Sequence, residues 1–312
     1  MYHCELCTYQ SEYQSLFVHG ALGGTKNKHR TLLFVIGTQR CGSTLLTRIL
    51  SSHPSVHIQN ELPLSEVFID GEQPDTTRRR LVKSIASRLS EETSDFLENH
   101  AVWGLKDPQL TEYLSVLSDF VDARFIVLVR DPRAVVNSYM ENRWGLGTNA
   151  YTGALRWSRE VTAQLAFKDD HDANCLLMRF EDLVYDVEGA IDKLCKYLGV
   201  PADKAMNQYY RKAAAFTINS ENINTNRKVD PTLAEKWRED LTEKQIGIIE
   251  TVAASEMHAL GYTPEAKPAN LKTHERFLYR LHQRVIGELQ LQYQLRRRKL
   301  QKIIKRKRKK LL

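Results

Sequence analysis

The sequence of 312 residues predicts an α/β fold, a P-loop-like parallel sheet flanked by helices, followed by a basic C-terminal helix. Three observations predict this class. Short runs of apolar, branched residues alternate with segments that favour helix. The first of these runs ends in a glycine-punctuated turn that leads into a helix. Residues 271–312 have a helical pattern whose polar side becomes densely basic toward the end.

The first strand and its turn lie in residues 32–46, LLFVIGTQRCGSTLL. The apolar run stops at Gly37, four residues separate it from Gly42, and a helix is expected over 43–50. This geometry directs free backbone N–H groups and the positive end of a helix dipole at one point, which suits phosphate or sulfate. The spacing is nearly that of a Walker A loop, but the lysine is missing and Arg40 is the nearest cation. An ordinary strand, turn and helix without a ligand is the alternative.

Further strands and helices are expected to alternate along the chain. His53-Pro54 ends the first helix, and a polar connection leads from it to Glu61. Strands are expected at 102–105, 125–129 and 175–180, helices at 76–90, 108–117, 132–140, 186–198, 202–212 and 231–260, and a long loop at 217–230. Because Gly37, Lys106 and Arg130 all fall at strand ends, we expect them to share one cleft at the carboxyl edge of the sheet.

Composition predicts the division of the chain and its compartment. Residues 1–30 form a polar lead-in, and its Cys4 and Cys7 have downstream histidines too far apart for a usual zinc finger. Residues 31–265 form the α/β domain, and residues 266–312 form a basic amphipathic helix. Five cysteines, an odd number, indicate a reducing compartment rather than a disulfide framework. Without a signal-peptide pattern or an apolar stretch of spanning length, the expected location is cytoplasmic, with peripheral attachment to a membrane as an option.

The positive charge of the chain is concentrated in its tail. Residues 296–310 hold eleven Lys or Arg and no acid, and without them 34 basic and 38 acidic residues remain. Leu300, Ile303 and Ile304 are interleaved with the cations, and only Tyr293 is nearby for stacking on a base. These features favour an amphipathic helix on an anionic membrane surface over RNA or DNA binding. A solubilising tail is the remaining alternative.

Two motifs resemble those of the sulfotransferases that use 3′-phosphoadenosine 5′-phosphosulfate (PAPS). Residues 38–46 are similar to the family's 5′-phosphosulfate loop, and residues 129–133 with Ser138 are similar to its 3′-phosphate motif. Glu61 and the Lys106-Asp107-Pro108 segment match the order and approximate spacing found in tyrosylprotein sulfotransferases and related bacterial enzymes. The similarity covers roughly residues 31–262. It departs from the family at Gln39 and Cys41 in the loop, and at Phe180, where a tyrosine hydroxyl stands in the tyrosine-modifying enzymes.

The resemblance implies a sulfotransferase fold and transfer of a sulfuryl group from PAPS to an acceptor hydroxyl, with no metal needed. It implies Glu61 as general base, Lys106 at the leaving phosphate and Arg40 at the sulfuryl group. The implied cofactor-binding residues are Arg40, Cys41, Gly42, Ser43, Thr44, Leu45, Arg130, Ser138 and Lys236. Structural alternatives are a solvated Glu61, a surface pair of Lys106 with Asp107, and an ion pair of Arg130 with Asp131 or Glu181.

The acceptor and two other functions stay open. No recognisable code lies in 62–75, 141–150 and 213–230, which are expected to line the acceptor side. The tail favours a glycolipid or saccharide acceptor, with tyrosine sulfation of peptides as the alternative. A different reading is a Mg²⁺-dependent P-loop-type nucleotide kinase that lacks the Walker lysine and uses Asp131 as its Walker B carboxylate. A further one is a non-catalytic nucleic-acid binder driven by the tail, and no pattern encodes the oligomeric state.

Overall fold

A five-stranded parallel sheet forms the centre of the computed structural model, which describes residues 30–211 and 223–309. The strand order is β2-β3-β1-β4-β5. The strands are β1 (Thr31–Ile36), β2 (Val56–Asn60), β3 (Val102–Lys106), β4 (Arg124–Val129) and β5 (Cys175–Arg179). The predicted α/β class is therefore confirmed. Cys4, Cys7 and the rest of 1–29, together with 212–222 of the expected acceptor side, lie outside the described residues.

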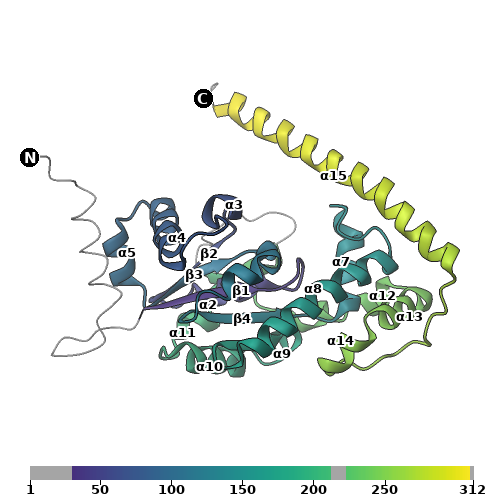
Figure 1. Ribbon diagram of the computed structural model, residues 1–312, viewed down its shortest axis with the longest axis horizontal. Helices are drawn as coiled ribbons and strands as arrows, with labels where there is room; N and C mark the ends of the chain where they lie inside the picture. The colour runs from purple at the N-terminus through teal and green to yellow at the C-terminus, as the bar shows by residue number, and fades with distance from the viewer. Residues whose placement is uncertain (1–29, 212–222, 310–312) are drawn as a thin grey trace, which may run out of the picture.

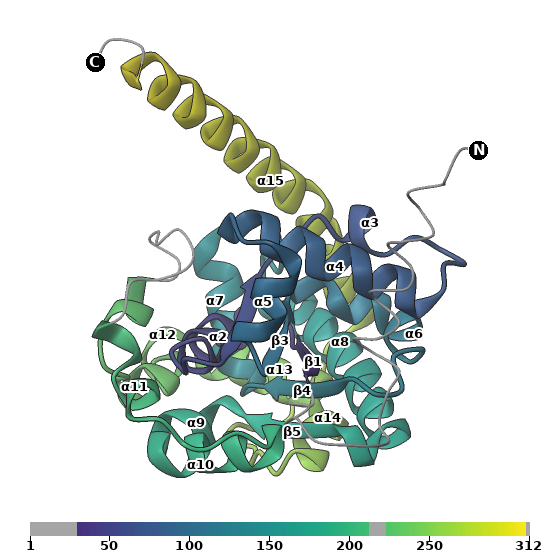
Figure 2. The same cartoon turned by 90° about the vertical axis from the view of Figure 1, so that its left-hand side faces the viewer.

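Helices cover both faces of this sheet, and Figures 1 and 2 show them as two layers. They are α2 (Ser43–Leu50), α3 (Leu64–Val67), α4 (Pro74–Leu89), α5 (Thr93–Asn99), α6 (Leu114–Leu117), α7 (Pro132–Asn142), α8 (Ala150–Asp170), α9 (Phe180–Tyr185), α10 (Val187–Leu198), α11 (Lys204–Asn207), α12 (Trp237–Asp240), α13 (Glu243–Val252), α14 (Ala254–Ala259) and α15 (Thr273–Lys309). Short 3₁₀ turns are η1 (Pro108–Tyr113), η2 (Asp172–Asn174), η3 (Tyr209–Arg211), η4 (Ile223–Asn226) and η5 (Pro231–Ala234).

The alternation of side chains along β1 separates two apolar cores. Leu32, Phe34 and Ile36 are buried on one side, in a cluster that includes residues of α4, α5 and α8. Leu33 and Val35 are buried on the other side, in a cluster that includes residues of α2 and α10. A strand buried on both faces needs apolar residues throughout, which is why this run reads as continuously apolar in the sequence.

Several parts of the body differ from the sequence prediction. The helix expected over 202–212 is divided into α11 and η3, and that expected over 231–260 into η5, α12, α13 and α14. The polar connection before Glu61 is in fact the edge strand β2, which pairs with β3 from Val56 to Asn60. The helix expected over 108–117 is divided into η1 and α6, because the backbone at Tyr113 (φ −112°, ψ 14°) departs from helical values. The longest helix of the body, α8, is absent from the predicted elements; Asn149 caps its start by accepting from the N–H of Thr152.

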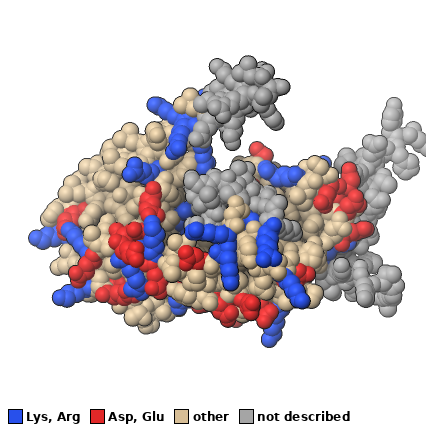
Figure 3. Space-filling view, turned by 180° about the vertical axis from the view of Figure 1, so that it is seen from behind, with Lys and Arg blue, Asp and Glu red and all other residues tan. Residues whose placement is uncertain are grey.

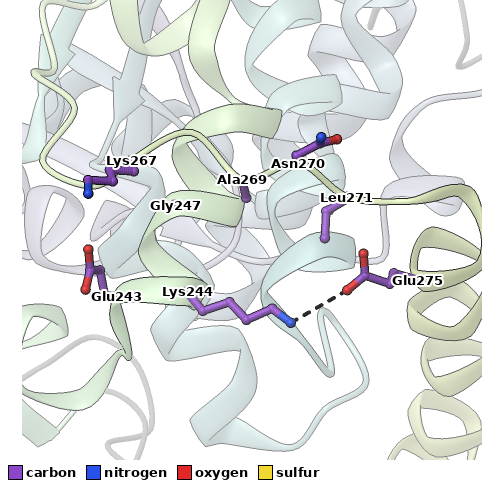
Figure 4. A pocket seen from close by; sticks show the side chains of 8 residues that line it. All are labelled: Glu243, Lys244, Gly247, Lys267, Ala269, Asn270, Leu271 and Glu275. Atoms are coloured by element: carbon purple, nitrogen blue, oxygen red, sulfur yellow. Dashed lines mark ion pairs between the residues drawn. The ribbon is translucent and has the colours of Figure 1, made fainter.

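The tail helix α15 leaves the body beside α13 and α14 and projects beyond it (Figures 1 and 2). It begins at Thr273, so the first residues of the segment 266–312, predicted to be helical, instead form a non-helical connection. A small pocket at this root is lined by residues of α13 and the connection, and Lys244 and Glu275 make an ion pair of 3.6 Å across it (Figure 4). Over the described residues, every helix is too short or too polar to cross a bilayer.

Candidate active site

The carboxyl ends of four neighbouring strands carry the predicted site residues. Because the order is β2-β3-β1-β4, Glu61 after β2, Lys106 at the end of β3, the loop after β1 and Arg130 after β4 follow one another along one edge of the sheet. This is the edge at which ligands of open α/β sheets bind. The structure therefore brings Gly37, Lys106 and Arg130 to one edge, as the sequence predicts.

The loop between β1 and α2 turns sharply and presents its backbone. The N–H of Cys41 donates to the carbonyl of Thr38 (3.2 Å), and both Arg40 (φ 69°) and Gly42 (φ 96°) adopt left-handed conformations. Gly42 is the N-cap of α2, and no side chain caps this helix. The N–H groups of Ser43 and Thr44 therefore have no partner within the helix, whereas that of Leu45 donates to the carbonyl of Gly42 (2.9 Å). The Cys41 side chain is buried in the core, and burial raises the pKa of its thiol. The loop thus offers amides rather than the thiol to a ligand.

The ring of Phe180 packs against Gly42 of this loop and against the guanidinium of Arg130. A Cβ atom at Gly42 would stand 2.2 Å from Cδ2 of Phe180, so only glycine fits between the loop and this ring. The guanidinium of Arg130 lies over the same ring, and its Cζ is 4.5 Å from the ring centroid. Phe180 therefore has a packing role in this chain, where a tyrosine hydroxyl was the family expectation.

Arg130 is held by backbone carbonyls rather than by carboxylates. It donates to the carbonyl of Arg40 (3.2 Å) and to that of Leu233 (3.3 Å), and its own carbonyl accepts from the indole of Trp157 (3.1 Å). Burial lowers the pKa of Arg130. Its Nε is buried and has no hydrogen-bond partner among the described residues. A buried, unsatisfied cationic donor at a strand end is an arrangement that an anionic ligand would complete.

The ion pair of Arg130 with Asp131 or Glu181, which the sequence leaves open as an alternative, is not formed among the described residues. Asp131 accepts from the guanidinium of Arg133 (2.6 Å), and Glu181 accepts from the N–H of Asp131 (3.0 Å) and from the hydroxyl of Tyr262 (2.8 Å). This pairing also argues against the kinase reading. The Asp131 carboxylate is buried and bound to an arginine, which leaves it poorly placed as a Walker B ligand for Mg²⁺.

Lys106 links the loop helix to Glu61. Its Nζ lies 3.5 Å from Oγ1 of Thr44 and 3.3 Å from Oε1 of Glu61. The lysine side chain is 3% exposed, whereas that of Glu61 is 65% exposed. A buried cation thus lies between the start of α2 and a carboxylate that is open to an incoming molecule.

Pairing of β2 with β3 places Glu61 against Lys106. The N–H of Glu61 donates to the carbonyl of Lys106 (2.9 Å), which continues the ladder one residue beyond Asn60. The backbone of Glu61 then turns into the left-handed region (φ 50°). Non-glycine residues adopt this conformation at a cost, and such residues cluster at functional sites.

Asp107 does not form the surface pair with Lys106 that the sequence leaves open. It caps η1 by accepting from the N–H of Gln109 (2.9 Å), and it is 5% exposed. Burial, with a smaller contribution from Glu61, raises the pKa of Asp107 to about 6. Lys106 is itself buried, so both residues belong to the interior of the site and neither is a surface charge.

Ser138 and Arg40 meet across the loop. The Nε of Arg40 donates to Oγ of Ser138 (2.9 Å), so α7 is tied to the loop that follows β1. The side chain of Lys236 instead makes ion pairs with Glu141 (2.6 Å) and Asp240 (3.0 Å) and is about half exposed. Its cofactor role therefore stays a prediction with less geometric support than those of the other residues.

Three supporting residues carry no signal in the sequence. Leu233 contributes only its carbonyl to Arg130, and Trp157 acts from α8, a helix that was not predicted. Asn137 donates to Asp240 (2.7 Å) and so joins α7 to α12. A backbone carbonyl contact is independent of residue type, so no motif could have revealed the first of these.

Comparisons with known proteins agree with this geometry. The model of the sulfotransferase family matches residues 33–204. Protein-tyrosine sulfotransferase 1 of Danio rerio is 25% identical over 279 residues, which cover 78% of this chain and 76% of the relative. Protein-tyrosine sulfotransferase A of Caenorhabditis elegans is 23% identical over 268 residues, which cover 78% of this chain and 70% of the relative. The sulfotransferase domain from the curacin biosynthetic pathway has the same fold, with a TM-score of 0.60 at 19% identity over 76% of this chain and 99% of that domain.

Proposed function

Because the chain belongs to the sulfotransferase family and is a PAPS-dependent enzyme, we propose that it transfers the sulfuryl group of PAPS to a tyrosine hydroxyl of a peptide. The observation that carries the chemistry is the contact of buried Lys106 with both Thr44 at the loop helix and Glu61 on the acceptor side. The tyrosine acceptor rests on the relatives, which are named protein-tyrosine sulfotransferases. They favour this alternative over the glycolipid or saccharide suggested by the basic tail.

The residues at the strand ends fit a nucleotide that is phosphorylated at both ends of its ribose. The N–H groups at the start of α2 would hold one phosphate, and Gly42 lets the loop pack directly against Phe180. The unsatisfied Nε of Arg130 would hold the second phosphate, together with Ser138, whose Oγ accepts from Arg40. PAPS, when bound, supplies the activated sulfuryl group.

Each side chain then has a separate task in the transfer. Glu61 takes the proton of the tyrosine hydroxyl as the new oxygen–sulfur bond forms, a role typically worth about 10²–10⁴-fold in rate. Lys106 donates to the phosphate oxygen that keeps the electron pair of the broken sulfur–oxygen bond. Arg40 stabilises the charge on the transferring group. Because Lys106 is buried, its charge acts with less screening than a surface lysine would have.

Transfer of labelled sulfate tests this proposal. The purified chain receives labelled PAPS and either a peptide with a single tyrosine, the same peptide with phenylalanine, a glycolipid or a soluble saccharide. We expect label on the tyrosine peptide alone, and a loss of about 10²-fold or more in the Glu61→Gln variant. Label that appears only on the glycolipid or saccharide would refute the tyrosine acceptor, and no transfer from PAPS to any acceptor would count against the proposed chemistry.

A further inference from the structure

The tail helix α15 has one side packed on the body. Gln283 donates to the carbonyl of Gly145 (2.6 Å) and accepts from the N–H of Thr148 (2.7 Å). The carbonyl of Tyr279 accepts from Asn149 (3.0 Å). Farther along, Gly287 lies so close to Gly145 that a Cβ at Gly145 would stand 2.5 Å from the Gly287 carbonyl oxygen. We call this the docked face, and Tyr279, Gln283 and Gly287 lie on one side of the helix because they repeat every fourth residue.

The docked face continues toward the basic end and is anchored at its root. The guanidinium of Arg298 lies 3.9 Å from the ring centroid of Trp144. At the other end, Glu275 pairs with Lys244 of α13, and Leu271 just before the helix is 7% exposed (Figure 4). The contacts therefore span 275–298 and fix the rotation of α15 about its own axis.

The opposite side of α15 is exposed and carries large apolar residues, with His282, Glu288 and Gln292 between them. We call it the free face; it consists of Phe277, Leu278, Leu281, Val285, Leu289 and Tyr293, whose exposed fractions lie between 45% and 64%. At 3.6 residues per turn these positions fill an arc of about 160°. Tyr279, Gln283 and Gly287 fall outside that arc, whereas His282, whose Nδ1 lies 2.9 Å from Oγ1 of Thr148, falls near its edge. Six large apolar side chains exposed side by side are more than the scattered single residues normal on a monomer.

Charge next to the free face favours an anionic partner. Arg296 and Lys299 continue the same side of the helix and are exposed, and residues 296–310 contain eleven cations without an acid. The body has no such excess on the face seen in Figure 3, where acidic and basic side chains are interspersed.

The pattern of the free face fits a flat apolar layer better than another helix or a nucleic acid. A coiled-coil partner requires a narrow seam with alternating steps of three and four residues. Here Phe277, Leu281, Val285, Leu289 and Tyr293 repeat every four residues, so the row drifts around the helix and widens into a broad arc. Alternating steps of three and four occur only from Leu278 through Leu281 to Val285, because the next two positions of that series are Glu288 and Gln292. A nucleic acid would use the cations but would leave the Leu and Val side chains in water.

We propose that α15 is a membrane-binding helix that lies in the interface of a bilayer containing anionic lipids, with the free face at the acyl boundary and the cations at the headgroups. Because the docked face points the other way, the helix binds the bilayer without leaving the body. The catalytic domain is then held at the membrane surface as one rigid unit with the helix. This inference is independent of the acceptor proposed above.

Vesicle flotation of the full chain tests the proposal. The vesicles consist of phosphatidylcholine alone or with about 30% phosphatidylserine. We expect the protein to float with the anionic vesicles only, and to be released at about 0.5 M salt. The triple variant Leu281→Ser, Val285→Ser, Leu289→Ser removes apolar area without changing charge, and we expect it to bind at least about tenfold more weakly.

A matched control tests whether vesicle binding requires the free face or any exposed apolar side chain. The double variant Ile69→Ser, Val121→Ser loses exposed apolar side chains (50% and 78% exposed) from the body, and its flotation should equal that of the parent. Circular dichroism and binding of adenosine 3′,5′-bisphosphate check that both variants are folded. Equal flotation of the triple variant and the parent would overturn the proposal. So would a dimer in light scattering that the triple variant converts to a monomer, or tighter binding to a DNA duplex or a single-stranded RNA than to anionic vesicles at physiological salt.

Discussion

Replacing Gly42 by alanine perturbs the loop between β1 and α2 at the point where it meets Phe180. The change has two separate costs. A left-handed backbone (φ 96°) costs a non-glycine residue roughly 1–2 kcal/mol. The new Cβ would also overlap the Phe180 ring, at 2.2 Å from its nearest atom, and overpacking of this kind adds about 1–3 kcal/mol. The ring has little room to yield, because Arg130 lies over it at 4.5 Å.

Gly71 provides a control for the cost of placing a non-glycine residue in a left-handed backbone conformation. Gly71 also has a left-handed backbone (φ 75°), but a Cβ there would meet no atom within 4 Å. Gly71→Ala should therefore lower the free energy of unfolding by about 1–2 kcal/mol, and Gly42→Ala by about 2–5 kcal/mol in total. Since the loop must shift to admit the methyl group, we also expect Gly42→Ala to lower turnover by about 10²-fold, as a displacement near 1 Å does in other sites.

Urea unfolding and calorimetric titration with adenosine 3′,5′-bisphosphate measure these effects. Only Gly42→Ala should weaken nucleotide binding, and its stability cost should shrink in a Phe180→Ala background, where the ring is gone. The reasoning would be refuted if both glycine variants lost the same stability, if nucleotide binding by Gly42→Ala equalled that of the parent, or if Phe180→Ala left the cost unchanged.

Four further predictions concern the site. Lys106→Ala should lower kcat by about 10²–10³-fold and leave peptide KM nearly unchanged, because the lysine acts on the leaving oxygen; a change confined to KM would contradict this. Ser138→Ala removes the partner of Arg40 and should weaken binding of adenosine 3′,5′-bisphosphate relative to adenosine 5′-phosphate, measured by calorimetry; equal loss for both ligands would contradict a 3′-phosphate role. Burial raises the pKa of Asp107 from 3.8 to about 6. The protonated carboxyl therefore contributes stability, up to about 3 kcal/mol, that is fully present below pH 3.8. This contribution is lost as the pH rises through about 6. Asp107→Asn should remove that slope in urea unfolding at a series of pH values, whereas exposed Asp70→Asn should keep it. Sulfate transfer should persist in a chelator, and a strict need for Mg²⁺ would instead support the kinase reading.

Much of the fold and site follows from local sequence patterns. The apolar run before Gly37 and the helix after Gly42 are local signals, and the structure has β1 and α2 where they predict them. Strands expected before Lys106 and Arg130 are present too, so the shared edge of the sheet could be predicted from parallel α/β geometry alone. The glycine spacing without a lysine indicated a loop that differs from a standard Walker A loop, although it left a lysine-less kinase open as an alternative.

The elements that the sequence did not predict are those whose stability comes from partners far along the chain. β2 contains His57, Gln59 and Asn60, and its polar residues resemble a loop because an edge strand is held by hydrogen bonds to β3 rather than by its own apolar pattern. α8 has mixed polarity and is buried by packing against several elements, so its periodicity is weak.

The sequence by itself determined the strand, turn and helix around Gly37 and Gly42, the positions of the strands before Lys106 and Arg130 and the basic character of the tail, because these depend on residue type and spacing over a few turns of chain. Only the tertiary structure decided that Glu61 touches Lys106, that Phe180 fills the space beside Gly42, and which side of α15 is free. Each of these depends on a contact between segments far apart in the sequence. Such contacts are selected by packing and hydrogen bonding of the whole fold, and they leave no periodic trace in either segment.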